Sequence, residues 1–260
     1  MTTASGNKDQ YNEMATEYDS YAELPIARLE AELIRTALGD CTGLAVLDLG
    51  GGSGTHARQA IKAGAHHVDV VDISDAMMQI GKDIEAKSSE ESKIRWLLAD
   101  ATKPMADQGV DISAGQYDIA MANWVFDHAH NPDELKGMWD NIAKSLKPGG
   151  RFIGIRVIAP GIHEEYNIKT GKYGCLFADI KDIPGGFECT TTLLTEPPFS
   201  FGLTPMEDSY KMINDIPRQL GFTDFICIPD ADSDVVKKDP QFWKEHLDNP
   251  MFAVVTAKKI

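Results

Sequence analysis

The chain has 260 residues, a length that suits one α/β domain with an insertion or at most two small domains. Hydrophobic residues make up 43% of it, and its formal net charge at pH 7 is −15. Because a field of that sign repels phosphate backbones and anionic lipids, the composition disfavours a nucleic-acid or membrane partner. It favours a small-molecule substrate.

The cysteines and the apolar runs predict a cytoplasmic protein. The four cysteines are widely spaced and form no C-x-x-C pair, which argues against a zinc or disulfide framework. Residues 1–10 are polar and lack a hydrophobic signal core, and no apolar run approaches the ~20 residues that cross a bilayer. We expect a monomer or a homodimer.

Hydrophobic periodicity predicts helices in the first forty residues, which we interpret as an N-terminal helical cap at 1–40. Tyr11 and Tyr18 fall on one helix face together with two apolar residues between them. A second apolar face covers 24–38, with Pro25 acceptable in its first turn.

Beyond residue 40 the pattern predicts one α/β domain at 41–260. Short apolar runs alternate with amphipathic stretches, and this alternation implies parallel strands with helices on both faces of the sheet. The predicted strands are 44–49, 68–71, 94–98, 117–122 and 152–158. The predicted helices are 55–63, 75–86 and 132–146.

The alternation stops at residue 159. Residues 159–204 are rich in glycine, proline, threonine and aromatic side chains, and a structureless loop of that length is unusual in a compact domain. We therefore predict an insertion that carries short elements of its own, including a strand at 187–195, and that forms a substrate lid. The elements predicted after it are a helix at 206–220, a strand at 222–228, a short helix at 240–247 and a last strand at 252–257.

A glycine-rich turn follows the first predicted strand at residues 48–54. Glycine is needed where the backbone turns with a positive φ or lies flat against a ligand. A helix that follows such a turn also points its N-terminus at the ligand. The segment 52–57 satisfies the G-x-G-x-x-A rule for dinucleotides, whereas Asp48 favours a ligand with an amino group because a carboxylate there repels pyrophosphate.

The second and third predicted strands each end at, or are soon followed by, an aspartate. Asp72 ends the second strand, where a carboxylate can accept hydrogen bonds from both hydroxyls of a ribose. Asp100 follows the third strand, where a carboxylate beside the backbone N–H of Ala101 can hold an adenine amine. Asp72 alone does not separate NAD from S-adenosylmethionine.

With these motifs the chain resembles the class I S-adenosylmethionine-dependent methyltransferases. The family's D-x-G-x-G-x-G motif is complete at 48–54, its ribose acid falls on Asp72 and its adenine-binding acid on Asp100. Its fourth-strand motif looks like 117–124, and its L-K-P-G-G turn like 146–150. The resemblance implies a Rossmann-like, seven-stranded, mostly parallel sheet with helices on both faces, an antiparallel last strand, N-terminal helices and an insertion after strand five.

The resemblance also implies S-adenosyl-L-methionine as the cofactor and methyl transfer to a small molecule as the function. Softer similarities point to the toxoflavin-synthase type, which acts on small heteroaromatic metabolites. At position 51 many members carry Cys or Ala, and we expect binding to tolerate Gly51. The residues expected to contact the cofactor are Tyr11, Tyr18, Asp48, Gly50, Gly52, Gly54, Asp72, Ile73, Met77, Asp100, Ala101, Asn123 and Trp124.

Methyl transfer from a sulfonium needs orientation and exclusion of water more than it needs a catalytic side chain. His128 follows the fourth strand and is a candidate general base, with Asp127 to orient it or to hold an amine. The alternative is a capped turn without chemistry. Trp124, Tyr11 and Tyr18 either face the ligands or pack as ordinary apolar surface.

The insertion supplies the candidates for the substrate side. Its six aromatic residues can form a hydrophobic lid: Tyr166, Tyr173, Phe177, Phe187, Phe199 and Phe201. His163 and Glu188 either line the pocket or lie on the surface. His66 and His67 begin the second strand at the end opposite the cofactor, and we interpret them as structural. No carboxylate cluster accompanies the fourth strand, so we predict no metal.

Two other functions fit parts of the pattern. An NAD-dependent oxidoreductase would use 52–57 and would need neither Asp48 nor Asp100. A methyltransferase fold can also use its cofactor without methyl transfer, as a cyclase or a regulatory module. The sequence leaves the methylated atom open among N, O, S and C.

Overall fold

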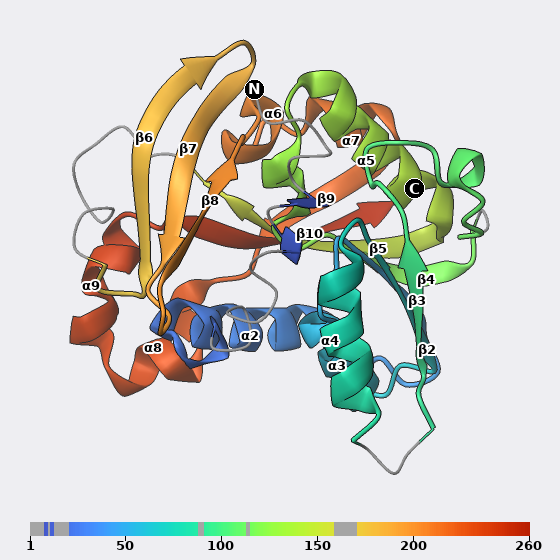
Figure 1. Ribbon diagram of the computed structural model, residues 1–260, viewed down its shortest axis with the longest axis horizontal. Coiled ribbons are helices and arrows are strands. Elements are labelled where there is room, and N and C mark those ends of the chain that lie inside the picture. The colour runs from blue at the N-terminus through green and yellow to red at the C-terminus, as the bar shows by residue number, and fades with distance from the viewer. Residues whose placement is uncertain (1–7, 10, 13–20, 88–90, 113–114, 159–170) are drawn as a thin grey trace.

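The computed structural model describes residues 8–9, 11–12, 21–87, 91–112, 115–158 and 171–260, and its centre is a seven-stranded sheet (Figure 1). The strand order is β3-β2-β1-β4-β5-β10-β9. The strands are β1 Ala45–Leu49, β2 His67–Asp72, β3 Ile94–Leu98, β4 Tyr117–Met121, β5 Leu146–Val157, β9 Phe222–Cys227 and β10 Phe252–Lys259. Neighbours pair in parallel except β10, which is antiparallel to both β5 and β9. This confirms the predicted fold class.

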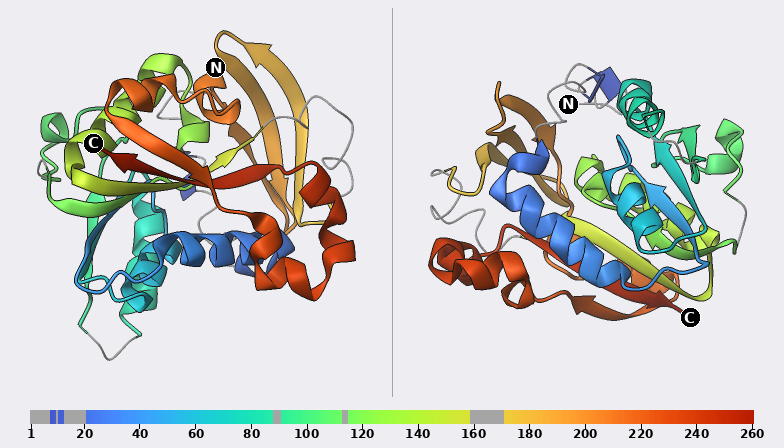
Figure 2. Two further views of the ribbon diagram at one scale, coloured as in Figure 1. Left: turned by 180° about the vertical axis from the view of Figure 1, so that it is seen from behind. Right: turned by 90° about the horizontal axis from the view of Figure 1, so that it is seen from below.

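Helices cover both faces of the sheet: α2 and α3 pack on one face, and α5 and α7 on the other (Figure 2). The helices are α2 Pro25–Leu38, α3 Thr55–Lys62, α4 Asp75–Glu85, α5 Pro132–Ser145, α6 Glu207–Tyr210, α7 Asp215–Gln219, α8 Asp234–Lys238 and α9 Pro240–Asp248. Short 3-10 turns include η2 Met105–Gln108, η3 Val125–His128 and η4 Asp230–Asp232. No helix within the described ranges is both long and apolar enough to cross a membrane.

Strand β1 shows why the central strands are apolar runs. Val46 belongs to the core shared with α2 and α3, whereas Leu47 and Leu49 belong to the core shared with α5. Successive side chains of a strand point to opposite faces, so a strand covered on both sides must be apolar almost throughout. The predicted strands other than β5, and most of the predicted helices, accordingly match the observed ranges within two residues at each end.

Helix α2 forms a layer of the main domain. Its Leu29, Leu33 and Ile34 are buried in the same core cluster as residues of β5 and β10. Pro25 occupies its first turn, and Gly39 follows its end with a φ of +59°. The first described helix of the predicted cap therefore shares the domain's hydrophobic core.

The insertion forms a three-stranded antiparallel sheet, which stands to the left of the main sheet in Figure 1. Its strands are β6 Cys175–Ile183, β7 Gly186–Leu193 and β8 Phe199–Leu203. The strand predicted at 187–195 is β7. Phe177, Leu193 and Leu203 are buried in the same cluster as α2, so one face of this sheet closes over the main domain.

The helix predicted at 206–220 is wrong, because the chain forms two short helices, α6 and α7. Between them Asn214 has a left-handed φ of 59°, and its side chain accepts a hydrogen bond from the buried Arg156 guanidinium (2.7 Å). Asp208 accepts an N–H at the start of α7 (2.7 Å). A buried guanidinium needs such acceptors, and that need overrides the helical periodicity. Pro217, which has no N–H, also fits an early turn better than the interior of a long helix.

Two smaller differences concern β5 and α8. The predicted turn at 146–150 is already part of β5, which pairs with β4 at Leu146 before the register shifts at a bulge. Helix α8 lies in a stretch for which the sequence predicted no element.

Leu33→Ala in α2 should lower the free energy of unfolding by about 2–5 kcal/mol, because it leaves a cavity in the shared core. Urea denaturation followed by far-UV circular dichroism and by tryptophan fluorescence should show both signals shifting together. The exposed Thr36→Ala on the same helix should change stability by less than about 0.5 kcal/mol. A helical signal that shifts alone would mean that α2 unfolds as a separate cap.

Candidate functional site

A cavity of about 390 Å³ lies at the carboxyl ends of strands β1 to β4. Strand β1 pairs with β2 on one side and with β4 on the other, so the strand order reverses at this point. Open parallel sheets bind ligands in the crevice that such a reversal creates. The lining draws on all four strand ends and on α2, through Gly50, Asp72, Asp100, Trp124 and Glu30.

The turn after β1 depends on three glycines with left-handed backbone: Gly50 (φ 70°), Gly52 (54°) and Gly54 (79°). A Cβ at Gly50 would lie 2.5 Å from Val125, and one at Gly54 would lie 2.6 Å from Trp96. Gly50 and Gly52 line the cavity, as predicted for cofactor contacts, whereas Gly54 stands at the start of α3 and outside the lining.

Asp48 at the end of β1 lies behind this turn and does not line the cavity. Its carboxylate is buried, and within the described residues no hydrogen bond of normal geometry reaches either oxygen. Burial and the neighbouring charge of Asp72 raise the pKa of Asp48 to about 7. A Cβ at Gly51 would lie 2.7 Å from Asp48 Oδ2. Asp48 therefore acts from behind the turn and not as the predicted direct contact, and Ala or Cys at position 51 requires its carboxylate to move.

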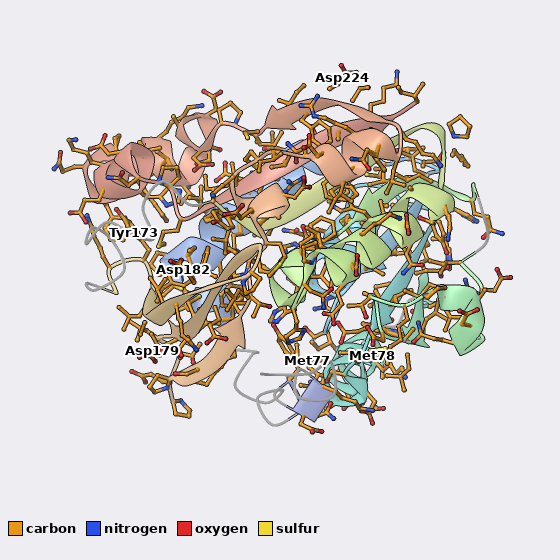
Figure 3. All side chains as sticks on the ribbon, turned by 90° about the horizontal axis from the view of Figure 1, so that it is seen from above. Met77, Met78, Tyr173, Asp179, Asp182 and Asp224 are labelled. Atoms are coloured by element: carbon orange, nitrogen blue, oxygen red, sulfur yellow. The ribbon has the colours of Figure 1, made fainter. Side chains whose placement is uncertain are left out.

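Asp72 ends β2 and lines the cavity. Its two oxygens accept the N–H groups of Gly52 and Ser74, each at 2.8 Å. Burial raises the pKa of Asp72, and these backbone donors oppose that shift. A carboxylate has about four lone-pair sites, so this one retains acceptor capacity for two hydroxyl groups. Ile73 and, from α4, Met77 (Figure 3) line the cavity beside it.

Asp100 marks the β3 end of the cavity, with Ala101 next to it on the lining. Its Oδ1 accepts the N–H (2.9 Å) and the hydroxyl (2.6 Å) of Thr102, and the Lys103 ammonium lies 2.8 Å from Oδ2. Burial raises the pKa of Asp100, but the bonds to Lys103 and Thr102 outweigh it and leave the pKa below its usual value. Asp100 is therefore ionised at neutral pH.

At the β4 end, Asn123 and Trp124 line the cavity as predicted. The Asn123 side chain is buried, and neither its oxygen nor its nitrogen has a hydrogen-bond partner in the described parts of the chain. Buried polar groups are almost always bonded, so this amide is available to a ligand. Trp124 has a left-handed φ of 64°, and its indole N–H donates to Glu30 (3.2 Å).

Glu30 is a site residue that sequence reasoning missed. It lies in α2, is 1% exposed, and accepts the Tyr21 hydroxyl (2.5 Å) as well as the Trp124 indole. Burial raises the pKa of Glu30 to about 7, although these two donors lower it. The sequence does carry one sign of it: Glu30 lies four residues after Ile26 and three before Leu33, so it is an acid on the apolar face of the predicted helix.

Asp127 and His128, predicted to act as a pair, lie in two different environments. Asp127 is fully buried outside the cavity lining and accepts the N–H of Val157 (3.1 Å), and burial raises its pKa to about 7. His128 lines the cavity, and its Nε2 lies 2.7 Å from the Tyr11 hydroxyl. Burial lowers the pKa of His128 to about 4, so its ring is neutral at pH 7. Tyr11, and not Asp127, is thus the hydrogen-bond partner of His128 at this site.

A second hollow, of about 40 Å³, adjoins the cavity beneath the insertion's sheet. Five side chains line both spaces and form what we call the shared wall: Tyr11, Tyr21, Glu30, Trp124 and His128. Strands β6 to β8 contribute mostly apolar side chains to the hollow: Cys175, Phe177, Thr191, Leu193, Phe201 and Leu203.

The aromatic residues of the insertion differ in their positions. Phe177 and Phe201 line the hollow, and Phe199 lies beside Phe201 with 6.0 Å between ring centroids. Tyr173 (Figure 3) stacks on a tryptophan of α9, and Phe187 packs against a tyrosine of α6. Neither Tyr173 nor Phe187 lines the hollow, because their rings fill the core around it.

Three predicted residues lie outside the described residues: Tyr18, His163 and Tyr166. Glu188 is on the surface side of β7 and pairs with a lysine of β6 (2.9 Å). His67 begins β2 and contacts an acid of the same strand, at the end of the sheet away from the cavity. Among the described residues, no group of three or more His, Cys, Asp or Glu side chains could hold a metal ion.

Solved structures share this architecture. The CcbJ methyltransferase from Streptomyces caelestis superposes with a TM-score of 0.64 at 18% identity and 97% coverage of either chain. The 1,6-didemethyltoxoflavin-N1-methyltransferase of Burkholderia thailandensis, solved with its acceptor and S-adenosylhomocysteine, gives a TM-score of 0.52 at 15% identity. That match covers 97% of this chain and 90% of the other. At sequence identities this low, the structural similarity establishes the shared fold and nothing more.

Residues 46–150 match a family model described as a methyltransferase domain. This part of the chain is therefore similar to methyltransferase domains, and solved structures with the same fold include S-adenosylmethionine-dependent methyltransferases. A curated relative, the demethylmenaquinone methyltransferase of Leptospira interrogans, is 28% identical over 156 residues, which are 58% of this chain and 59% of that protein. The chain thus spans about three fifths of the length of that curated relative. The family resemblance is confirmed, and the oxidoreductase alternative loses its support.

Asp48→Asn should become more stable relative to the wild type as the pH rises from about 4 to about 7. The pKa of Asp48 is about 7 in the folded protein and near its ordinary 3.8 when unfolded. Between these values the folded wild type holds a proton that the unfolded chain has lost, so its stability falls as the pH rises. The neutral Asn lacks this dependence, and the difference should reach about 2–4 kcal/mol above pH 7.

Urea denaturation of the unliganded proteins at pH 5, 6, 7 and 8 measures this difference. Asp75→Asn is the matched control, because Asp75 is exposed and its pKa is lowered, so its effect should not vary over that range. An Asp48→Asn effect that is equally independent of pH would contradict the raised pKa of this buried carboxylate.

Proposed function

We propose that this chain transfers the methyl group of S-adenosyl-L-methionine to a small, largely apolar acceptor held beneath strands β6 to β8. The observation that carries the proposal is the shared wall, whose five side chains line both the cavity and the hollow. A cofactor in the cavity and an acceptor in the hollow would meet at this wall. In-line displacement needs that approach, and holding the two reactants together can supply several kcal/mol of the barrier reduction.

The residues around the cavity fit the cofactor group by group. The Asp72 carboxylate would accept the ribose hydroxyls, and Asp100 with Ala101 would hold the adenine amine. The turn at Gly50 and Gly52 allows close backbone approach to the methionine half, and the unpartnered Asn123 amide supplies polar contacts there. The bound cofactor supplies an electrophilic methyl on a sulfonium, and the protein orients it and excludes water.

The hollow supports an apolar, ring-bearing acceptor. Phe177, Leu193 and Phe201 form much of its surface, and Tyr11 with the neutral His128 provides a polar contact at its edge. Two of the compared proteins are named for methyl transfer to demethylmenaquinone and to 1,6-didemethyltoxoflavin, which favours acceptors of that size. His128, with its pKa lowered to about 4, is a weak base, so we assign it to positioning.

The remaining predictions from the sequence accompany this proposal. We place the protein in the cytoplasm as a monomer or a homodimer, with residues 1–40 as an N-terminal helical segment and the insertion at 159–204 as the cover of the substrate.

Asp72→Asn should weaken the binding of S-adenosylhomocysteine roughly 10- to 100-fold, since two hydroxyls lose a charged acceptor. Isothermal titration calorimetry measures the affinity, with NADH as a second ligand that should not bind the wild type. Asp75→Asn, three positions further on and exposed, should bind like the wild type. Unchanged affinity in Asp72→Asn would overturn the placement of the ribose.

Incubation with methyl-labelled cofactor and a panel of ring-bearing acceptors tests the transfer itself. The panel includes 1,6-didemethyltoxoflavin and a reduced demethylmenaquinone analogue. We expect label in an acceptor together with an equal amount of S-adenosylhomocysteine, and the rate should fall at least tenfold in Phe201→Ala, which removes an aromatic wall of the hollow. Cofactor binding without any S-adenosylhomocysteine formation, in the panel and in cell extract, would favour the use of the cofactor by a cyclase or a regulatory module.

A further inference from the structure

Glu30 is an acid of the shared wall that forms no ion pair with any residue the structure describes. Its carboxylate is 1% exposed, and its hydrogen bonds come from two neutral donors, the Tyr21 hydroxyl and the Trp124 indole. Burial raises its pKa to about 7, and these two donors oppose the shift.

The other three acids of the cavity have different partners, and Glu134 accepts the N–H of His130 (2.8 Å). Asp72 is held by two backbone N–H groups, and Asp100 has the Lys103 ammonium at 2.8 Å. A carboxylate moved from water into a protein interior loses several kcal/mol unless a positive charge or several donors compensate it. Asp72 and Glu30 thus both lack an ion pair with a described residue, and Glu30 is the one of the two that belongs to the shared wall.

The titratable groups that face the same hollow do not supply the missing charge. Tyr11 and Tyr21 are neutral phenols, and His128 from η3 is neutral because burial lowers its pKa to about 4. Cys175 from β6 is a neutral thiol, because burial raises its pKa. Two arginines also line the neighbouring cavity: Arg28 pairs with Glu23 (2.8 Å), and Arg58 donates to the carbonyl of Ser53 (2.7 Å). A cationic ligand at the shared wall would bring a positive charge next to the Glu30 carboxylate.

The order of the strands indicates which part of the cofactor reaches Glu30. Asp100 lies at the β3 end, Asp72 at the β2 end, and the glycine turn follows β1, so adenine, ribose and the methionine half would follow one another towards β4. Trp124, which follows β4, donates directly to Glu30. An acceptor in the hollow can reach the methyl only if the sulfonium end lies at the shared wall.

Resting on this proposed function, we propose that the Glu30 carboxylate is the counter-charge of the cofactor's sulfonium. It favours the cationic S-adenosylmethionine over the product S-adenosylhomocysteine, whose sulfur is neutral. The preference for cofactor over product is therefore built into α2, outside the glycine turn and the strand-end acids that bind both ligands alike.

Glu30→Gln tests the charge with little change of shape, because the amide oxygen can still accept the Trp124 indole N–H. Calorimetry at pH 8 gives the affinities for S-adenosylmethionine and for S-adenosylhomocysteine, and their ratio is the readout. We expect the ratio to fall at least about tenfold in Glu30→Gln. Glu85→Gln is the matched control: Glu85 also accepts an indole N–H, that of Trp96 (3.4 Å), but lies outside the cavity lining, so the ratio should not change.

The pH dependence of the same affinity ratio gives a second measurement. In the wild type the preference for the cationic ligand should fall from pH 8 to pH 6, because protonation of Glu30, with its pKa near 7, removes the attraction. The same affinity ratio measured for Glu30→Gln at each pH shows how much of the change comes from titration of the ligands themselves. Tyr21→Phe deletes one donor to the carboxylate, so its pKa rises further and the loss of preference should begin at a higher pH.

Equal ratios in the wild type and Glu30→Gln would overturn the proposal and leave Glu30 as a support for Trp124, while methyl transfer stands. If Glu30→Gln does not fold, a wild-type ratio that follows pH and shifts in Tyr21→Phe supports the counter-charge, and a ratio that does neither overturns it. If neither ligand binds the wild type, the proposed function itself fails, and the role of Glu30 fails with it.

Discussion

The Asp72 carboxylate holds the site together, because it ties the glycine turn after β1 to the end of β2. Gly52 donates its N–H to one carboxylate oxygen and Ser74 donates to the other, while the Gly50 N–H reaches the carbonyl of Val71 (2.7 Å). These bonds require the left-handed backbone at Gly50 and Gly52. The same carboxylate faces the cavity, so the shape of the turn and the recognition of a ligand depend on one side chain.

Local patterns were sufficient to predict most of the fold and many of the residues that line the cavity. The strands are apolar because both faces of the sheet are covered, and the turn is rich in glycine because its backbone is left-handed and crowded. Both properties are visible in short stretches of sequence. Asp72, Asp100, Asn123 and Trp124 could be placed because each directly follows or ends a strand, and the carboxyl ends of parallel strands meet at one edge.

The missed features depend on contacts between residues far apart in the chain. The break at 211–214 exists because Asn214 accepts from Arg156, a partner that periodicity does not reveal. Asp127 and His128 are neighbours in sequence, yet β5 binds one and Tyr11 the other. Glu30 reads as an ordinary polar interruption of an apolar helix face until α2 is seen beside Trp124.

Buried acids lie both behind the cavity lining and on it, and only those on the lining can be stabilised by a ligand. Asp48 and Asp127 lie behind the cavity lining, where burial raises their pKa to about 7 and no ligand can compensate them. Asp72 and Glu30 face the cavity, so hydroxyl groups or a cation can offset the cost of burying them. In a chain with a net charge of −15, a ligand that carries positive charge into this region lowers the repulsion between these groups.

The residues matched by the family model include most of the cavity lining but little of the hollow. The matched residues 46–150 contain the glycine turn, Asp72, Asp100 and Trp124, which together line the cofactor cavity. The hollow is built mainly from α2 and from β6 to β8, which lie outside that range.

Backbone geometry constrains the first half of the site, the cavity, because a glycine turn and strand-end acids suit one cofactor. The second half consists of side chains on a separate sheet, which can change in size without disturbing the turn. Glu30 lies in this second half yet faces the first, and it is therefore the residue through which an individual acceptor site can act on the common cofactor.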